Sequence, residues 1–323
     1  MNQRQKSIKE SIAWTAATLL IYNVLVYFMM VFILSWLVKS FTGNEVGGSI
    51  REVAFTLLNN TDYIGIAYLI NLPLGLLLFQ WYRKGKLFKE DWKAKGPRKM
   101  NWKVFVVFLS FFGFSQLFFA LYQTGLENLL NQYGLTISTA TESATLQGDH
   151  SWSMLLYAWF LGPIFEELVF RGAILSQLKK YGSVFAIIMS SVFFGFFHQN
   201  PVQIPFAFMI GLVMAYVALE YGILWTMIFH IINNFGLEQF SRLLQLAFGE
   251  EGAESAYFVL LVLASVISLL VLLIKRKEIG HYLREHRADK GTYPAVLRSV
   301  WFWIFILLTT HASLVYITPL LGK

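Results

Sequence analysis

Residues 155–175 read LLYAWFLGPIFEELVFRGAIL, an almost unbroken apolar stretch that carries three charged side chains, Glu166, Glu167 and Arg171. About 20 mostly apolar residues are enough for a helix to cross the hydrocarbon core of a bilayer. The stretch therefore predicts a membrane-spanning helix that holds ionisable groups at the depth of the lipid.

The composition of the whole chain is that of a membrane protein. Of its 323 residues, 56% are hydrophobic and 17% aromatic, and only 14% are charged. Soluble domains are nearer a quarter charged. We predict an all-α fold, a polytopic transmembrane helical bundle of about eight to nine spans, forming a single integral membrane domain over residues 1–323. The absence of cysteine excludes disulfides and thiolate chemistry.

Nine apolar segments are candidate spans. Their approximate bounds are 13–38, 62–82, 104–123, 152–176, 183–199, 201–219, 223–240, 256–274 and 299–317. The fifth, sixth and seventh are short and closely linked, so a re-entrant segment within 183–240 is an alternative to simple crossings.

Basic residues alternate from loop to loop. Four segments are basic: the N-terminal tail, the loop 83–103 with nine Lys and Arg, the pair Lys179–Lys180, and the loop 275–298 with seven Lys and Arg. The loops between them carry almost no Lys or Arg. The positive-inside rule then predicts a cytoplasmic N-terminus. We interpret the net charge of +7 as topology, in particular the cluster in 83–103, and predict no nucleic-acid partner. A bacterial plasma membrane, with membrane lipid around the chain, is the predicted location.

The three charges must avoid lipid, because each would cost roughly 2.5–3.5 kcal/mol at the centre of a span on insertion scales. Glu167 and Arg171 lie four residues apart with the acid first, the favoured order for a helical ion pair. Glu166 lies about 100° around the helix and has no local cation, which favours it as a general base. Gly162 and Pro163 precede the glutamates and predict a break in the helix, with a new half-helix lining a water-accessible cavity.

Two further polar sets follow in apolar segments. His198 ends the segment SSVFFGFFHQNP, with Phe194 four residues earlier on the same face, and His230 and Asn234 lie four apart in WTMIFHIINNFG. Two histidines and a glutamate are a set that binds a divalent metal or activates water. An asparagine amide can stabilise an oxyanion.

Each residue taken singly also fits a structural role, such as a hydrogen bond between helices. By spacing alone, a catalytic or metal site and a polar core for transport or structure are equally supported. Glu238, four residues beyond Asn234, either extends the polar cavity or pairs with Arg242, and we favour the pair with Arg242. As simple crossings, the glutamates and His198 would lie at different depths.

Taken together, EELVFR, FGFFH and HIINN match the patterns EExxxR, FxxxH and HxxxN in order. The chain resembles the CPBP family of intramembrane metalloproteases, also called the Abi family, which includes the type II CAAX prenyl endopeptidases. The resemblance covers a protease core of about residues 152–240.

The resemblance implies hydrolysis of a peptide bond in or near the membrane. Glu166 would activate water, His198 would hold that water or a metal, and His230 with Asn234 would stabilise the oxyanion. Glu167 and Arg171 would shape the site. His198, His230 and Glu166 are the implied ligands if a divalent metal such as zinc is bound. The implied substrate is a peptide or a membrane-tethered protein.

Two other functions are compatible with the sequence. Members of this family also serve as regulators, so the chain can instead be a non-catalytic membrane adaptor, or an immunity protein of the same fold. A proton-coupled transporter using Glu166 and the histidines is less favoured, because no inverted repeat is visible in the sequence.

Overall fold

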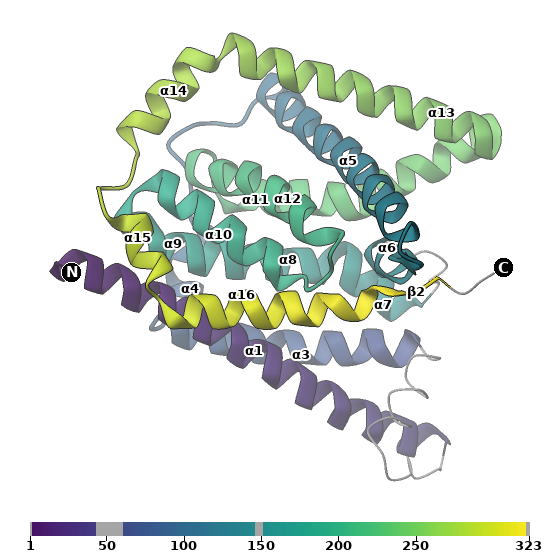
Figure 1. Ribbon diagram of the computed structural model, residues 1–323, viewed down its shortest axis with the longest axis horizontal. Helices are drawn as coiled ribbons and strands as arrows, with labels where there is room; N and C mark the ends of the chain where they lie inside the picture. The colour runs from purple at the N-terminus through teal and green to yellow at the C-terminus, as the bar shows by residue number, and fades with distance from the viewer. Residues whose placement is uncertain (1, 43–60, 146–150, 321–323) are drawn as a thin grey trace.

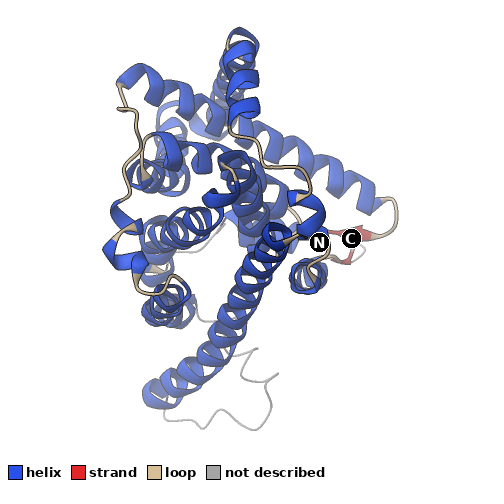
Figure 2. Cartoon of the chain, turned by 90° about the vertical axis from the view of Figure 1, so that its left-hand side faces the viewer, coloured by secondary structure: helices blue, strands red, loops and turns tan. Residues whose placement is uncertain are grey.

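Helices build almost the entire described chain. The computed structural model describes residues 2–42, 61–145 and 151–320. Within these ranges the strands are limited to β1 (Leu135–Thr136) and β2 (Thr318–Pro319), which pair antiparallel near the C-terminus (Figure 2). The predicted all-α fold is confirmed.

Six helical segments are long and apolar enough to cross a membrane, and two shorter apolar helices accompany them in the described part of the chain. This makes the protein an integral membrane protein. The six segments are Gln3–Ile33, Tyr63–Tyr82, Trp102–Asn131, Trp152–Tyr181, Gln203–Glu220 and Ile223–Ile274, and the shorter two are Ser183–Phe197 and Val300–Tyr316.

The structure divides these segments into the following elements. The peripheral helices are α1 (Gln3–Thr42), α3 (Thr61–Tyr82), α5 (Trp102–Asn131), α13 (Leu237–Ile274) and α16 (Val300–Ser313). The central elements are α7 (Trp152–Leu156), η2 (Tyr157–Leu161), α8 (Gly162–Glu167), η3 (Leu168–Ile174), α9 (Leu175–Leu178), α10 (Ser183–Phe197), α11 (Gln203–Glu220), α12 (Ile223–Ile231) and η5 (Ile232–Gly236). The short connectors are α4 (Lys86–Lys89), η1 (Asp91–Lys93), α6 (Ser138–Thr145), η4 (Lys179–Tyr181), α14 (Arg276–Glu285), α15 (Thr292–Leu297) and η6 (Leu314–Tyr316).

The central elements are enclosed by the peripheral helices (Figure 1). α5 and the second half of α13 lie on one side of α8, α10, α11 and α12, and α1, α3 and α16 lie on the other. Large aromatic side chains fill the space between them, among them the fully buried Phe170, Phe194 and Phe229. Polar side chains on the central helices are thereby kept away from lipid.

The two predicted spans 223–240 and 256–274 belong to one helical run, Ile223–Ile274. The run is bent at Gly249, whose φ of 72° and ψ of 177° are not helical. A positive φ is readily adopted by glycine alone among ordinary residues. The chain therefore reverses there, and the second part of α13 returns along α5, where Ser268 Oγ lies 3.0 Å from Ser110 Oγ.

The helix does not break at Gly162–Pro163, and this prediction is wrong. Gly162 keeps helical angles (φ −61°, ψ −55°), and its N–H donates to the carbonyl oxygen of Tyr157, five residues back. Proline has no N–H to donate to the preceding turn. A wide π turn, η2, absorbs this loss while the helix continues, so the fourth span is one apolar segment from Trp152 to Tyr181.

The four basic stretches lie at one end of the bundle (Figure 1). Arg4 Nη2 of the N-terminal tail is 2.8 Å from Asp289 Oδ2 in the loop after α14. The N–H of Val184 donates to the carbonyl of His286, which joins the start of α10 to the same loop. The C-terminal strand lies at the opposite end. This is the arrangement that the alternation of charge predicts.

Candidate active site

Both glutamates of the EELVFR motif lie on α8, and their surroundings differ. The side chain of Glu167 is fully buried, whereas 17% of the Glu166 side chain is exposed. α8 is followed directly by η3, in which the N–H of Leu175 donates to the carbonyl of Phe170, five residues back. Wide π turns are frequent at functional sites.

Glu167 is the centre of a buried ionic cluster. Its Oε1 accepts a hydrogen bond from Arg171 Nη1 at 3.0 Å, so the predicted ion pair forms. The same oxygen lies 2.9 Å from His230 Nδ1. This second contact joins α8 to α12 across 63 residues of sequence. A cation and a ring N–H compensate the burial of Oε1, while Oε2 is buried without a hydrogen-bond partner in the described part of the chain.

Arg171 is held from a second direction by Phe194 of α10. The guanidinium carbon lies 4.2 Å from the centre of the phenyl ring, a cation–π contact. Arg171 Nε and Nη2 are buried without a hydrogen-bond partner in the described part of the chain. The rings of His198 and His230 both meet the ring of Phe194 edge to face. Phe194 therefore fixes the relative placement of three motif residues.

The partners of His230 determine which ring nitrogen carries the proton. A carboxylate oxygen that already binds Arg171 can only accept, so Nδ1 of His230 is the protonated nitrogen. Nε2 is then an unprotonated lone pair, and it lies 3.7 Å from Glu166 Oε2. That separation is too long for a direct hydrogen bond and fits two groups that share a water molecule.

The ring of His198 carries its proton on the same nitrogen, Nδ1, as the ring of His230. His198 follows the last residue of α10, and its Nδ1 lies 2.8 Å from the carbonyl oxygen of Phe194. A carbonyl only accepts, so Nδ1 donates and Nε2 is left as a lone pair. The turn after His198 is fixed by the buried Asn200, whose Oδ1 accepts from the N–H of Val202 and whose Nδ2 donates to the carbonyl of Ala140 in α6.

The short length of α10 accounts for the depth of His198. The helix has 15 residues and ends beneath α6, where Asn200 and Val202 are almost fully buried. Fifteen residues of α-helix span about 22 Å, less than the hydrocarbon thickness of about 30 Å. His198 and His230 both contact Phe194, and His230 contacts Glu167, so the structure brings His198 to the same part of the bundle as the glutamates.

Asn234 lies in η5, one turn beyond His230, and part of its hydrogen-bonding capacity is used within the protein. Its Nδ2 donates to the carbonyl of Ala158 in η2 at 2.9 Å, and its Oδ1 accepts from Asn233. Asn233 in turn accepts from Gln116 Nε2 of α5 at 3.0 Å. One of the two N–H bonds of the Asn234 amide is left for another acceptor. Asn233 and Gln116 were not predicted as site residues, although the doubled asparagine is a visible signal in the sequence.

Glu238 pairs with Arg242, as favoured from the sequence, with 2.7 Å between Oε1 and Nη2. Its other oxygen accepts from Trp159 Nε1 at 2.7 Å, a contact that was not predicted. The two oxygens therefore join η2 to α13 beside the site. Glu238 therefore stabilises the packing of η2 against α13. Its polar contacts in the described part of the chain are with Trp159 and Arg242, and not with the cluster around Glu167.

The two histidines offer part of the ligand set of the predicted metal. The unprotonated Nε2 atoms of His198 and His230 have the chemistry of metal ligands, with the other ring nitrogen of each held by an acceptor. However, the described residues hold no group of three His, Asp or Glu side chains arranged to bind a metal ion. The described side chains therefore do not form a complete metal site.

Fold and site together define the class: an all-α integral membrane protein with a glutamate–histidine cluster among its central helices. Residues 148–236 match a protein-family model described as Rce1-like, type II CAAX prenyl endopeptidase Rce1-like. The match spans all six motif residues and agrees with the resemblance found in the sequence. It indicates a protease of the CAAX type. Searches of curated proteins and of solved structures gave no match.

Proposed function

We propose that the protein is an intramembrane endopeptidase in which Glu166 activates water. The observation that carries the proposal is the placement of Glu166 opposite His230. Glu167 fixes the tautomer of that histidine, so an unprotonated nitrogen and a carboxylate oxygen face each other 3.7 Å apart. A water molecule between them has an acceptor for each of its protons.

The proposed reaction is general-base hydrolysis. Glu166 takes a proton from the water while its oxygen attacks the carbonyl carbon of the peptide bond. The second proton of the water lies at the unprotonated Nε2 of His230 or of His198, and the ring that accepts it orients the water. The carbon–nitrogen bond then breaks, and the proton held by Glu166 passes to the leaving amine.

Charge develops on the carbonyl oxygen during the attack, and donors aimed at that oxygen lower the barrier. The free N–H of Asn234 is the proposed donor. His230 joins it when the second proton of the attacking water moves to Nε2, and that proton is lost to solvent as the product carboxyl group ionises. The carboxylate of Glu167 lies 2.9 Å from Nδ1 and holds the ring of His230 in place. Arg171 holds Glu167 ionised and in place.

The proposed substrate is a peptide or a membrane-tethered protein, reached from the surrounding lipid. The family model matched by residues 148–236 is named for prenyl endopeptidases. A bacterial plasma membrane with the N-terminus in the cytoplasm is the proposed setting. It is supported by the gathering of the basic loops at one end of the bundle.

The test compares the N-termini of membrane proteins, by mass spectrometry, in cells that produce wild type, Glu166→Gln or His230→Ala at matched levels. Glu250→Gln, an exposed acid on α13, is the control. We expect a set of cleaved termini that is present with wild type and the control and absent with both site variants. If all four strains give the same termini while retaining the wild-type phenotype, the adaptor function replaces the protease.

Dependence on a divalent metal is a separate proposal, supported only by the donor chemistry of the two histidines. Activity of the purified protein would be measured before and after treatment with a zinc chelator, together with the metal content of the protein. Loss of activity that added zinc restores supports a metal. Unchanged activity after the metal content has fallen to background excludes it.

A further inference from the structure

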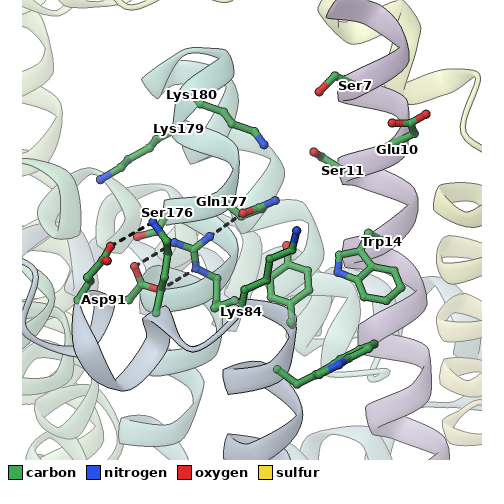
Figure 3. A pocket seen from close by; sticks show the side chains of 15 residues that line it. Ser7, Glu10, Ser11, Trp14, Lys84, Asp91, Ser176, Gln177, Lys179 and Lys180 are labelled. Atoms are coloured by element: carbon green, nitrogen blue, oxygen red, sulfur yellow. Dashed lines mark hydrogen bonds and ion pairs between the residues drawn. The ribbon is translucent and has the colours of Figure 1, made fainter.

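A large polar pocket lies away from the candidate active site, at the end of the bundle that holds the basic loops (Figure 3). Its volume is about 840 Å³, within the usual range for ligand sites. Three segments that are distant in sequence surround it: the first turns of α1, the turn between α3 and α4, and the end of α9 with η4. Lys179 and Lys180 extend from η4 above the pocket, while Ser11 and Trp14 lie along α1 at its side.

Two walls of the pocket are fixed by internal bonds. Arg83 donates to both carboxylate oxygens of Asp91, at 2.7 and 3.1 Å, and to Gln177 Oε1 at 2.6 Å. The hydroxyl of Tyr181 lies 2.8 Å from the hydroxyls of both Ser7 and Ser11. These side chains are engaged with one another, so they shape the pocket. Recognition of a ligand is left to the other polar side chains of the lining.

The remaining charges in the pocket are mostly positive. Lys86 lies 3.5 Å from Glu90, and Arg83 is neutralised by Asp91. Lys84, Lys179 and Lys180 then face Glu10 as the single remaining acid of the lining. In the described part of the chain, the ammonium groups of Lys84 and Lys179 have no ion-pair partner, and Lys180 lies over the ring of Tyr181.

Lys84 is held toward the pocket by its backbone. Its φ of 52° is unusual for a residue with a side chain. The turn is closed by bonds from the N–H of Lys84 to the carbonyl of Trp81 and from the N–H of Gly85 to that of Gln80. The hydroxyl of Ser176, which also lines the pocket, makes no hydrogen bond within the described chain and is available as a donor.

Two tryptophans beside the pocket indicate its level in the membrane. Trp14 and Trp81 contact each other with ring centres 4.9 Å apart and are 41% and 57% exposed. Exposed tryptophans gather where a membrane meets water, at the level of the lipid head groups. Unpaired lysines beside them attract anionic lipid head groups.

We propose that this pocket binds the phosphate head group of an anionic phospholipid from the leaflet on the side of the basic loops. Lys84 and Lys179 reach the phosphate from two sides, the hydroxyl of Ser176 donates to it, and Trp14 with Trp81 packs on the glycerol region. From the sequence, the lysines of 83–103 were predicted to set the topology alone. The pocket gives Lys84 a ligand-binding role that is independent of the proposed protease activity.

The test is native mass spectrometry of the full chain in detergent, titrated with phosphatidylglycerol and, separately, with phosphatidylcholine of the same acyl chains. The double variant Lys84→Gln/Lys179→Gln is compared with Lys89→Gln/Lys277→Gln, which removes two exposed basic-loop lysines outside the pocket. We expect wild type and the control pair to retain one phosphatidylglycerol in preference to phosphatidylcholine. The pocket pair should bind it about tenfold more weakly. All four lysines are exposed, so both double variants should unfold at the wild-type temperature.

Equal weakening in the two double variants overturns the proposal, because it would show attraction to basic charge in general. Equal retention of phosphatidylcholine and phosphatidylglycerol by wild type overturns it as well. Inorganic phosphate is titrated in a third arm. Binding of inorganic phosphate that depends on Lys84 and Lys179, without preferential binding of phosphatidylglycerol, would identify a soluble phosphate compound as the ligand instead of a lipid.

Discussion

At the scale of single residues, one oxygen atom organises the site. Glu167 Oε1 accepts from both Arg171 and His230. Glu167→Gln keeps the volume but leaves Arg171 buried without a counter-ion. Removing one partner of a buried ion pair costs about 3–5 kcal/mol. We expect the variant to lose activity and to unfold at a clearly lower temperature in detergent.

Glu166→Gln is the matched comparison, one residue away on the same helix. Its side chain is partly exposed and has no cation within ion-pair distance in the described chain except a protonated His230. We expect the loss of activity to equal that of Glu167→Gln, with a change in unfolding free energy within about 1 kcal/mol. Equal destabilisation by both substitutions would contradict the separation of a reacting and a positioning glutamate.

Some of the side-chain contacts at the site can be predicted from the sequence, and others cannot. The Glu167–Arg171 pair follows from helical spacing, and so does the contact of Glu238 with Arg242. The bond from His230 to Glu167 does not, because it depends on how α12 packs against α8. The same holds for the bond from Trp159 to Glu238, since an indole between two helices can face either one.

At the scale of elements, three π turns lie beside the motif residues. They are η2, η3 and η5, and each is closed by an N–H bonded five residues back. η2 supplies the Ala158 carbonyl that holds Asn234. A Cβ added at Gly162 would lie 2.9 Å from the carbonyl oxygen of Tyr157 in the same turn. Gly162→Ala must therefore displace η2.

We expect Gly162→Ala to destabilise the fold by about 1–3 kcal/mol, the usual cost of overpacking, and to lower activity by disturbing Asn234. Gly125→Ala on α5 is the control, because a Cβ there has no neighbour within 4 Å. Alanine favours a helix over glycine by about 1 kcal/mol, so this variant should be neutral or more stable. Thermal unfolding and cleavage assays of the two proteins test the difference.

The sequence predicts the elements better than their local geometry. Long apolar runs identify the spans because burial in lipid demands them. Gly162–Pro163 gives the same signal for a break as for a π turn, and the neighbouring helices decide between the two. The predicted spans 223–240 and 256–274 lie in one helical run, on either side of the non-helical Gly249.

At the scale of the whole molecule, the distribution of charge predicts orientation. The chain has no cysteine, so single cysteines can be placed without background. Lys290→Cys lies at the end with the basic loops, and Tyr133→Cys lies at the other end, where Tyr133 is 74% exposed. We expect a membrane-impermeant maleimide to label Tyr133→Cys in intact cells and Lys290→Cys only after permeabilisation. The reverse pattern would contradict the predicted cytoplasmic N-terminus.

The short α10 has a consequence for the membrane around the protein. A helix of 15 residues spans about 22 Å, so the polar turn at His198 ends short of a bilayer face about 30 Å from the other. The surrounding helices shield α10 from lipid, and water must therefore follow the polar turn inward. In reconstituted vesicles, longer acyl chains should slow turnover by lengthening that path, while shorter chains should speed it. The thickness of the bilayer would then act on the reaction without any ligand.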